Sequence, residues 1–266
     1  MRRRKFNIFA ISKRQRFVLA VIFLSFGLFL SQHLLGKSGI FVSFFLSLLT
    51  VVLLFVSNYK DIRENFSPFY FVLPFFYSLA FGLFYFLVPA RFLTRMLMTS
   101  FYAVGLYSLF LSQNIFTVAV MRTIALLSSA RTVSFLITLV SYFFLSNVVF
   151  SLDLQAISTA ILLFVYTFFL AYQSIWTYTM EKSFSIAMAI WSFALSFCLF
   201  ESALLLWFWP SSPTFIALFL TGFFYVLVGL SHVWFDKRLF RNVLWEYMWV
   251  AVIVSCILFL FTSWKG

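Results

Sequence analysis

Long apolar runs separated by short polar breaks dominate the chain. Inside a bilayer every backbone N–H and C=O must be bonded within the protein, so apolar runs of about 20 residues predict membrane-spanning helices. The runs predict nine spans, at approximately 17–35, 40–57, 69–89, 96–113, 132–150, 156–178, 184–209, 214–232 and 243–262. The sequence therefore predicts an all-α fold, a polytopic transmembrane helix bundle of about nine spans.

Residues 114–131, "NIFTVAVMRTIALLSSAR", are apolar enough for a tenth span, but Arg122 interrupts them. An arginine at the centre of a spanning helix costs about 2.5–3.5 kcal/mol on insertion scales. We therefore expect residues 114–131 to form a short interfacial helix on the cytoplasmic side after the fourth span, or a re-entrant segment covered by protein.

The distribution of Lys and Arg predicts the orientation of the bundle. With a cytoplasmic N-terminus, 15 of the 19 basic residues lie in cytoplasmic segments and four lie outside, which is a strong positive-inside bias. If residues 114–131 crossed the membrane, the count would fall to ten against eight. We therefore expect a multi-pass protein of the cell's inner (plasma) membrane, with the N-terminus in the cytoplasm and the C-terminus outside.

Composition agrees with this class, because 64% of the residues are hydrophobic, 10% are charged and the mean hydropathy is +1.05. The net charge of +12 is concentrated in the segment 1–16, "MRRRKFNIFAISKRQR", which directly precedes the first span. This placement predicts a basic cytoplasmic segment that contacts anionic lipid headgroups, and it does not favour nucleic-acid binding. Residues 17–266 are then one transmembrane domain. The expected partners are the bilayer and either a membrane protein or a second copy of the chain.

One carboxyl group is out of place in this pattern. Glu201 lies in the run "SFCLFESALLLWFWPSSP", eight residues before Trp209, or roughly 12 Å along a helix. That distance places it inside hydrocarbon. Ala187, Ala194 and Cys198 share its helical face, and small residues at such positions predict packing against other helices.

The predicted topology restricts the partners available to Glu201. Gln32 and His33 lie near the outer end of the first span, and Asn147 lies near the outer end of the fifth. With one of these residues, Glu201 forms either a structural interhelical hydrogen bond or a proton- or substrate-binding site.

A second group of polar residues lies near the cytoplasmic ends of the spans: Arg122, Arg131, Glu246, Gln113, Asn114 and His232. Glu246 is in the first turn of the ninth span, where the helix dipole favours a carboxylate. Pairing with Arg122 or Arg131 would tie the interfacial segment to the last helix. Gln113 and Asn114 either end the fourth span or line a cavity beside Arg122, and His232 reads as an interfacial residue.

Sequence motifs of catalysis are missing from the chain. It has no P-loop, no G-x-S-x-G, no H-E-x-x-H and no His or Cys cluster with metal-ligand spacing. We therefore expect no catalytic site, no metal and no cofactor. Two functions remain open: a non-catalytic envelope, assembly or partner-binding membrane subunit, and a small transporter or channel that uses Glu201.

The segments "SQNIFTVAVMRTIALLSSARTVSF" and "ESALLLWFWPSSP" carry a resemblance to other proteins. Over roughly residues 96 to 250 the chain resembles a group of uncharacterised multi-pass bacterial membrane proteins. The resemblance implies an integral membrane protein and brings no activity or site residue with it.

The orientation is testable with single cysteines at Ser128, Ser151 and Ser183, in a background from which Cys198 and Cys256 are removed. We expect an impermeant thiol reagent to label the first and third positions only from the cytoplasmic side, and the second only from outside. The reverse labelling would show that residues 114–131 cross the membrane.

Overall fold

The computed structural model describes residues 12–35, 39–64, 66–88, 91–119, 126–181, 184–237 and 240–262, apart from the side chains of 32–35, 60 and 64. Within these residues, nine helices are long and apolar enough to span a membrane. They are α1 (Lys13–Leu35), α2 (Gly39–Ser57), α4 (Phe69–Leu87), α5 (Phe92–Ala119), α6 (Leu127–Ser151), α7 (Ala156–Thr179), α8 (Ile186–Trp207), α9 (Pro213–Phe235) and α10 (Arg241–Leu260). The predicted polytopic helix bundle is confirmed.

Two elements differ from the sequence prediction. A short helix, α3 (Tyr59–Glu64), occupies the polar break after α2. The separate helix expected over 114–131 is wrong for the described residues, because 114–119 continue α5 and 127–131 begin α6. The polar pair at 113–114 does not end α5, since the buried side chains of Gln113, Phe116 and Thr117 keep the helix packed through this turn.

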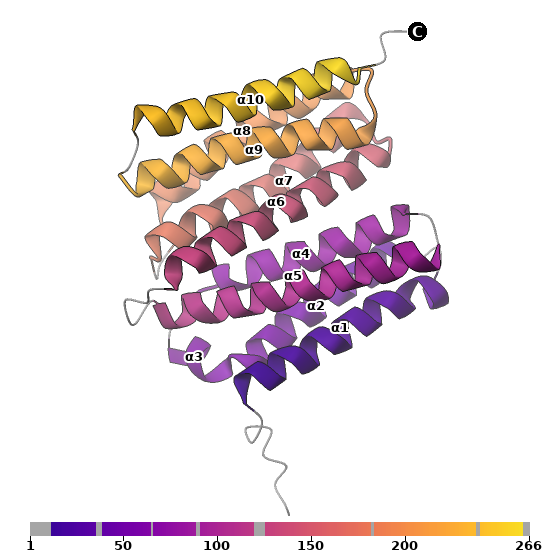
Figure 1. Ribbon diagram of the computed structural model, residues 1–266, viewed down its shortest axis with the longest axis vertical. Coiled ribbons are helices and arrows are strands. Elements are labelled where there is room, and N and C mark those ends of the chain that lie inside the picture. Colours follow the sequence, from indigo (N-terminus) through magenta and orange to yellow (C-terminus); the bar gives the residue numbers. More distant parts are fainter. Residues whose placement is uncertain are drawn as a thin grey trace, which may run out of the picture.

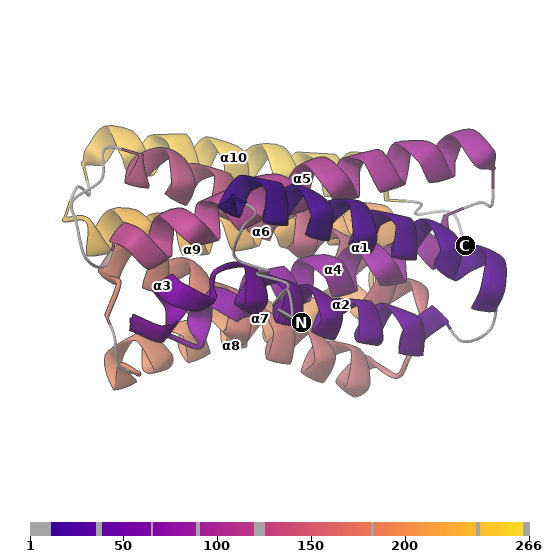
Figure 2. The same cartoon turned by 90° about the horizontal axis from the view of Figure 1, so that it is seen from below.

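The spanning helices form two layers (Figures 1 and 2). The front layer of Figure 1 runs in the order α1, α5, α6, α9, α10, and the back layer runs α2, α4, α7, α8, with each helix packed on its neighbours. Contacts between α4 and α6, and between α7 and α9, join the layers. Below, the N-side end is the end of the bundle at which α1 begins, and the far end is the opposite one.

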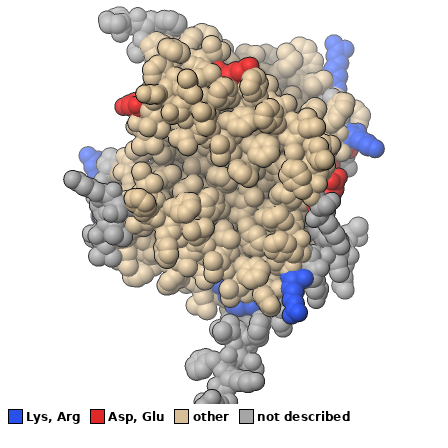
Figure 3. All heavy atoms as spheres, turned by 180° about the vertical axis from the view of Figure 1, so that it is seen from behind, with Lys and Arg blue, Asp and Glu red and all other residues tan. Residues whose placement is uncertain are grey.

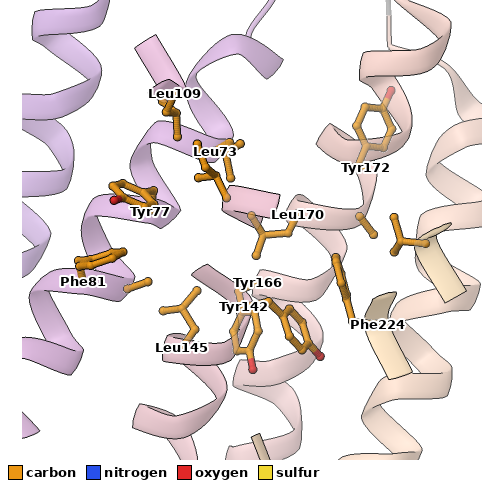
Figure 4. Packing of buried hydrophobic residues seen from close by; sticks show 14 of the residues in the cluster. Leu73, Tyr77, Phe81, Leu109, Tyr142, Leu145, Tyr166, Leu170, Tyr172 and Phe224 are labelled. Carbon is orange, nitrogen blue, oxygen red and sulfur yellow. The ribbon is translucent and has the colours of Figure 1, made fainter. Parts of the chain in front are cut away.

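Aromatic rings fill the space between the layers. Tyr142 of α6 stacks on Phe224 of α9 with the ring centroids 4.3 Å apart, and Tyr166 of α7 packs edge-on against Tyr142 (Figure 4). The hydroxyl group of Tyr166 is hydrogen-bonded to the Oγ of Ser146 at 2.8 Å. In a dry interior an unbonded hydroxyl is costly, so each buried tyrosine needs such a partner.

A hydrogen-bonded chain joins three helices in the first half of the bundle. Ser78 of α4 lies 2.8 Å from the Oγ1 of Thr50 on α2 and 2.9 Å from the hydroxyl of Tyr102 on α5. All three residues are buried. The chain fixes the relative positions of α2, α4 and α5, because each hydroxyl is satisfied only in this arrangement.

Gly82 permits the close approach of α4 to α2. A Cβ atom there would lie 2.8 Å from Cβ and Oγ of Ser43 and 3.2 Å from its Cα, so the backbones would have to separate. We expect Gly82→Ala to lower the free energy of unfolding by about 1–3 kcal/mol, measured by denaturant titration in detergent micelles.

Gly27→Ala is the matched control, because the new Cβ would meet only Leu46 Cδ1 at 3.4 Å. Its stability should equal or exceed that of the parent protein, since alanine is the better helix former. Equal stability of the two variants would show that the α2–α4 approach does not depend on Gly82.

Candidate functional site

The outward face of α8 contains Glu201. Glu201, Ala187, Ala194 and Cys198 are all exposed, so they share one face as predicted. The prediction that this face packs against other helices of the chain is wrong. The opposite face of α8, which includes the small residues Ser192, Ser196 and Ala203, is buried against α7 instead. The helix has two faces with small residues, and only the tertiary structure selects which one is covered. We call the exposed set the α8 face.

The α8 face points away from α7, the neighbour of α8 in the back layer. The helix α8 is the last of that layer, with α7 on one side and α9 in front. Trp191 lies between the α8 face and α9, where its Nε1–H donates to Ser231 at 2.8 Å. In the front layer α10 extends one place further and packs mainly on α9, with Leu258 as its one buried residue among those described. A further helix beside α8 would continue the back layer beneath α10.

Glu201 lies within the depth of the membrane. It is six residues before Trp207, the last residue of α8, or about 9 Å along the helix axis. No hydrogen bond or ion pair joins its carboxyl group to another described residue. In the view from behind, the Lys and Arg side chains lie toward the margins of a broad surface of other residues (Figure 3).

The partners predicted for Glu201 are engaged elsewhere or fall outside the description. Asn147 donates from Nδ2 to the Oγ1 of Thr214 at 3.1 Å and accepts from Ser151 at 3.4 Å. It therefore joins α6 to the start of α9. The side chains of Gln32 and His33 lie outside the described residues.

At the N-side end, Arg131 and His232 come together around one tyrosine. The guanidinium carbon of Arg131 is 4.6 Å from the centroid of the Tyr178 ring, and the His232 ring stacks on that ring at 4.2 Å. Arg131 also donates to the carbonyl oxygens of Thr177 at 2.9 Å and Tyr178 at 3.0 Å, and lies 4.0 Å from an Asp236 carboxylate oxygen. We call these residues the Arg131 cluster.

The Arg131 cluster is an internal fastening between helix ends. Arg131 from α6 caps the last carbonyl groups of α7, where a cation is favourable. His232 of α9 is buried and hydrogen-bonded to Ser174 of α7 at 3.0 Å. The hydrogen bonds of Arg131 and His232 are made to α7, so the cluster joins α6, α7 and α9. The sequence indicated Arg131 and His232 but did not indicate that Tyr178 of α7 and Asp236, which follows the end of α9, would be their partners.

The remaining predicted residues of this end do not join the cluster. Glu246 is exposed on α10, and the predicted pairing with Arg131 is wrong, because Asp236 takes that position. Arg122 lies outside the described residues. Gln113 is buried, and neither it nor the Oδ1 of Asn114 has a hydrogen-bond partner among the described residues.

A groove of about 570 Å³ runs along α1 and α2, with Arg16 at its N-side end and Phe23 and Phe26 deeper in. Arg16 and Phe26 are ten positions apart, or about 15 Å along the helix, which is half of a hydrocarbon core. The groove suits an acyl chain whose headgroup lies near the guanidinium. Contact of the basic segment with anionic lipid stays a prediction, since residues 1–11 lie outside the description.

Within the described part of the chain, no three His, Cys, Asp or Glu side chains come close enough to bind a metal ion together. The family model DUF5656, whose description is "protein of unknown function", matches residues 21–261. No curated protein and no solved structure matches the chain.

The Arg131 cluster generates a stability prediction. Arg131→Ala removes two hydrogen bonds to carbonyl groups and leaves Asp236 without its cation. We expect a loss of about 1–3 kcal/mol in the free energy of unfolding, measured by denaturant titration in micelles. The exposed Arg241 at the start of α10 supplies the control. Arg241→Ala should stay within about 0.5 kcal/mol of the parent protein. Similar losses in both variants would contradict the structural role of the cluster.

Proposed function

We propose that this chain, which belongs to the DUF5656 family of proteins of unknown function, is a non-catalytic membrane subunit that binds a transmembrane helix of a partner protein. The protein is a polytopic membrane protein with a bundle of about nine spans. The observation that carries the proposal is the exposure of Glu201 on the α8 face, which points away from α7 at the end of the back layer.

Lipid is an unfavourable neighbour for Glu201. Acyl chains offer neither a hydrogen bond nor a counter-charge. An acidic residue costs about 2.5–3.5 kcal/mol at the centre of a spanning helix on insertion scales, and less at the depth of Glu201, six residues from the end of α8. Such residues almost always face other protein or a water-filled cavity. A partner helix that donates a hydrogen bond to the carboxyl group removes this cost. Binding of the partner is therefore more favourable by about the same free energy.

The part of the α8 face that precedes Glu201 suits the close approach of a helix. Ala187, Ala194 and Cys198 have small side chains, and small residues let helix backbones pack closely in membranes. They are spread over about three turns of α8, as helix–helix contact requires. The side of α10 that does not pack on α9 supplies a second wall, because Leu258 is the one buried residue of this helix among those described.

The partner helix has a definable chemistry. It contains a hydrogen-bond donor about 9 Å from its own membrane boundary, opposite Glu201. Arg, Lys, Asn or Gln can supply that donor, and small or apolar residues would surround it. The alternative of a transporter needs Glu201 to line an internal path, and its position on an outer surface does not favour that function.

A photo-reactive amino acid at Ala194 tests the proposal in the native membrane. We expect a discrete protein adduct, which Glu201→Leu weakens by about threefold to thirtyfold, because an interhelical hydrogen bond in membranes is worth about 0.6–2 kcal/mol. Glu201→Gln distinguishes the donors: an amide partner tolerates it, whereas a cationic partner loses its counter-ion. Adducts are quantified by mass spectrometry.

Two controls complete this experiment. The photo-reactive residue at Ile22, exposed on α1 at the other end of the layers, should give only lipid adducts. Glu246→Leu, a change of an exposed carboxylate on α10, should leave the Ala194 adduct intact. An adduct of twice the chain's mass would show that a second copy occupies the α8 face, and the partner would then be wrong. Absence of any protein adduct at Ala194 would refute the proposal.

A further inference from the structure

A small polar pocket lies at the far end of the bundle, distinct from the α8 face. Its volume is about 250 Å³, and it lies between the α6–α7 connection and the α8–α9 connection. The lining residues that matter for its chemistry are Asp153, Thr159, Trp207, Trp209 and Ser211. Anchoring at a membrane interface would not by itself explain why the two tryptophans share a pocket with an acid.

The two indole rings are fixed in place. Trp207 donates from Nε1 to the carbonyl oxygen of Leu154 at 2.9 Å, so α8 is tied to the α6–α7 connection. Trp209 donates from Nε1 to the Oγ1 of Thr262 at 2.8 Å and packs edge-on against Phe259. Since both N–H groups are already used, the rings offer their apolar faces and edges to a ligand.

The polar groups of the pocket favour a cation that can donate hydrogen bonds. Asp153 is the one acidic residue in a far-end loop among the described residues, and no ion pair occupies its carboxylate. Its backbone is left-handed, with φ of 46°, a conformation that Asp tolerates better than most residues. The Oγ of Ser211 is buried and has no hydrogen-bond partner among the described residues. A buried hydroxyl of this kind needs a ligand or water.

We propose that this pocket binds a small primary ammonium group, such as that of ethanolamine. Asp153 is the counter-ion, Ser211 Oγ accepts an ammonium N–H, and the indole rings supply apolar and cation–π contact. A quaternary ammonium has no N–H for Ser211, so the pocket discriminates against it. The group reaches the pocket either as a lipid headgroup, because the pocket is at a membrane boundary, or as a free amine.

The first test uses the full-length protein in nanodiscs of phosphatidylcholine, titrated with ethanolamine at constant ionic strength. Calorimetry and tryptophan fluorescence should show saturable binding, with tetramethylammonium weaker by about tenfold. Asp153→Asn should weaken ethanolamine binding by more than about tenfold, because it removes a charge-assisted hydrogen bond. Asn also tolerates the left-handed backbone, so the variant should keep the fold.

Further variants separate the contacts. Ser211→Ala should bring the affinities for ethanolamine and tetramethylammonium close together, because it removes the acceptor that only the primary amine uses. Glu181→Gln, which changes an exposed carboxylate at the N-side end, is the matched control and should bind as the parent does. Equal affinity of Asp153→Asn and the parent would overturn the proposal.

A second arm identifies the source of the group. Nanodiscs of equal phosphatidylethanolamine and phosphatidylcholine are used, and the lipids retained by the protein are measured by native mass spectrometry. Retention of phosphatidylethanolamine by the parent, lost in Asp153→Asn, identifies a lipid headgroup. Binding of free ethanolamine without lipid enrichment identifies a soluble amine. If neither is observed, the pocket does not bind this class of ligand.

Discussion

Polar groups inside a bilayer must find their partners within the protein, because the surrounding hydrocarbon offers none. In α2, for example, the hydroxyls of Ser43, Ser47 and Thr50 each donate to the carbonyl oxygen one turn back. Where a polar side chain is larger, the partner comes from another helix, as for Tyr166 with Ser146. The helix arrangement thus provides hydrogen-bond partners for these polar side chains. A polar side chain without such a partner indicates an interaction outside the chain.

The Arg131 cluster and Glu201 show the two outcomes of this constraint. Arg131 is charged, yet carbonyl groups, a carboxylate and a ring face surround it, so it fastens α6 to α7 and α9. Glu201 has comparable polarity and no partner among the described residues. Because polar groups in the bilayer need partners, Arg131 has a structural role, and Glu201 is assigned to an interaction outside the chain.

The order of the helices in the two layers shows where a partner of Glu201 could bind. Between the ends of the layers, α4, α6, α7 and α9 each have neighbours on both sides, whereas α8 and α10 are terminal. Because α10 extends beyond α8, a further helix could pack beside both of them at this end of the layers. The pocket beside Asp153 lies at the far end of the same half of the molecule, where Trp209 joins the α8–α9 connection to Thr262 beyond α10.

The sequence by itself determined the class of fold, the number of spans and most of their bounds. In hydrocarbon every spanning segment must be apolar over its length, so the length of an apolar run suffices to locate a span. The helices α2 and α7 match their predicted bounds within about one residue. It also identified Glu201 as anomalous, since a carboxyl group in an apolar run needs no tertiary information to be noticed.

Only the tertiary structure decided which side of each helix is covered. Both faces of α8 contain small residues, and the periodicity of a helix hydrophobic all round does not distinguish the face buried on α7 from the face left open. The partners of Arg131 and Asn147, and the meeting of Asp153 with Trp207 and Ser211, likewise join separate helices and loops. Such pairs depend on the order of the helices in the layers. Hydrophobicity does not specify this order, because an apolar helix face is as stable against lipid as against another helix.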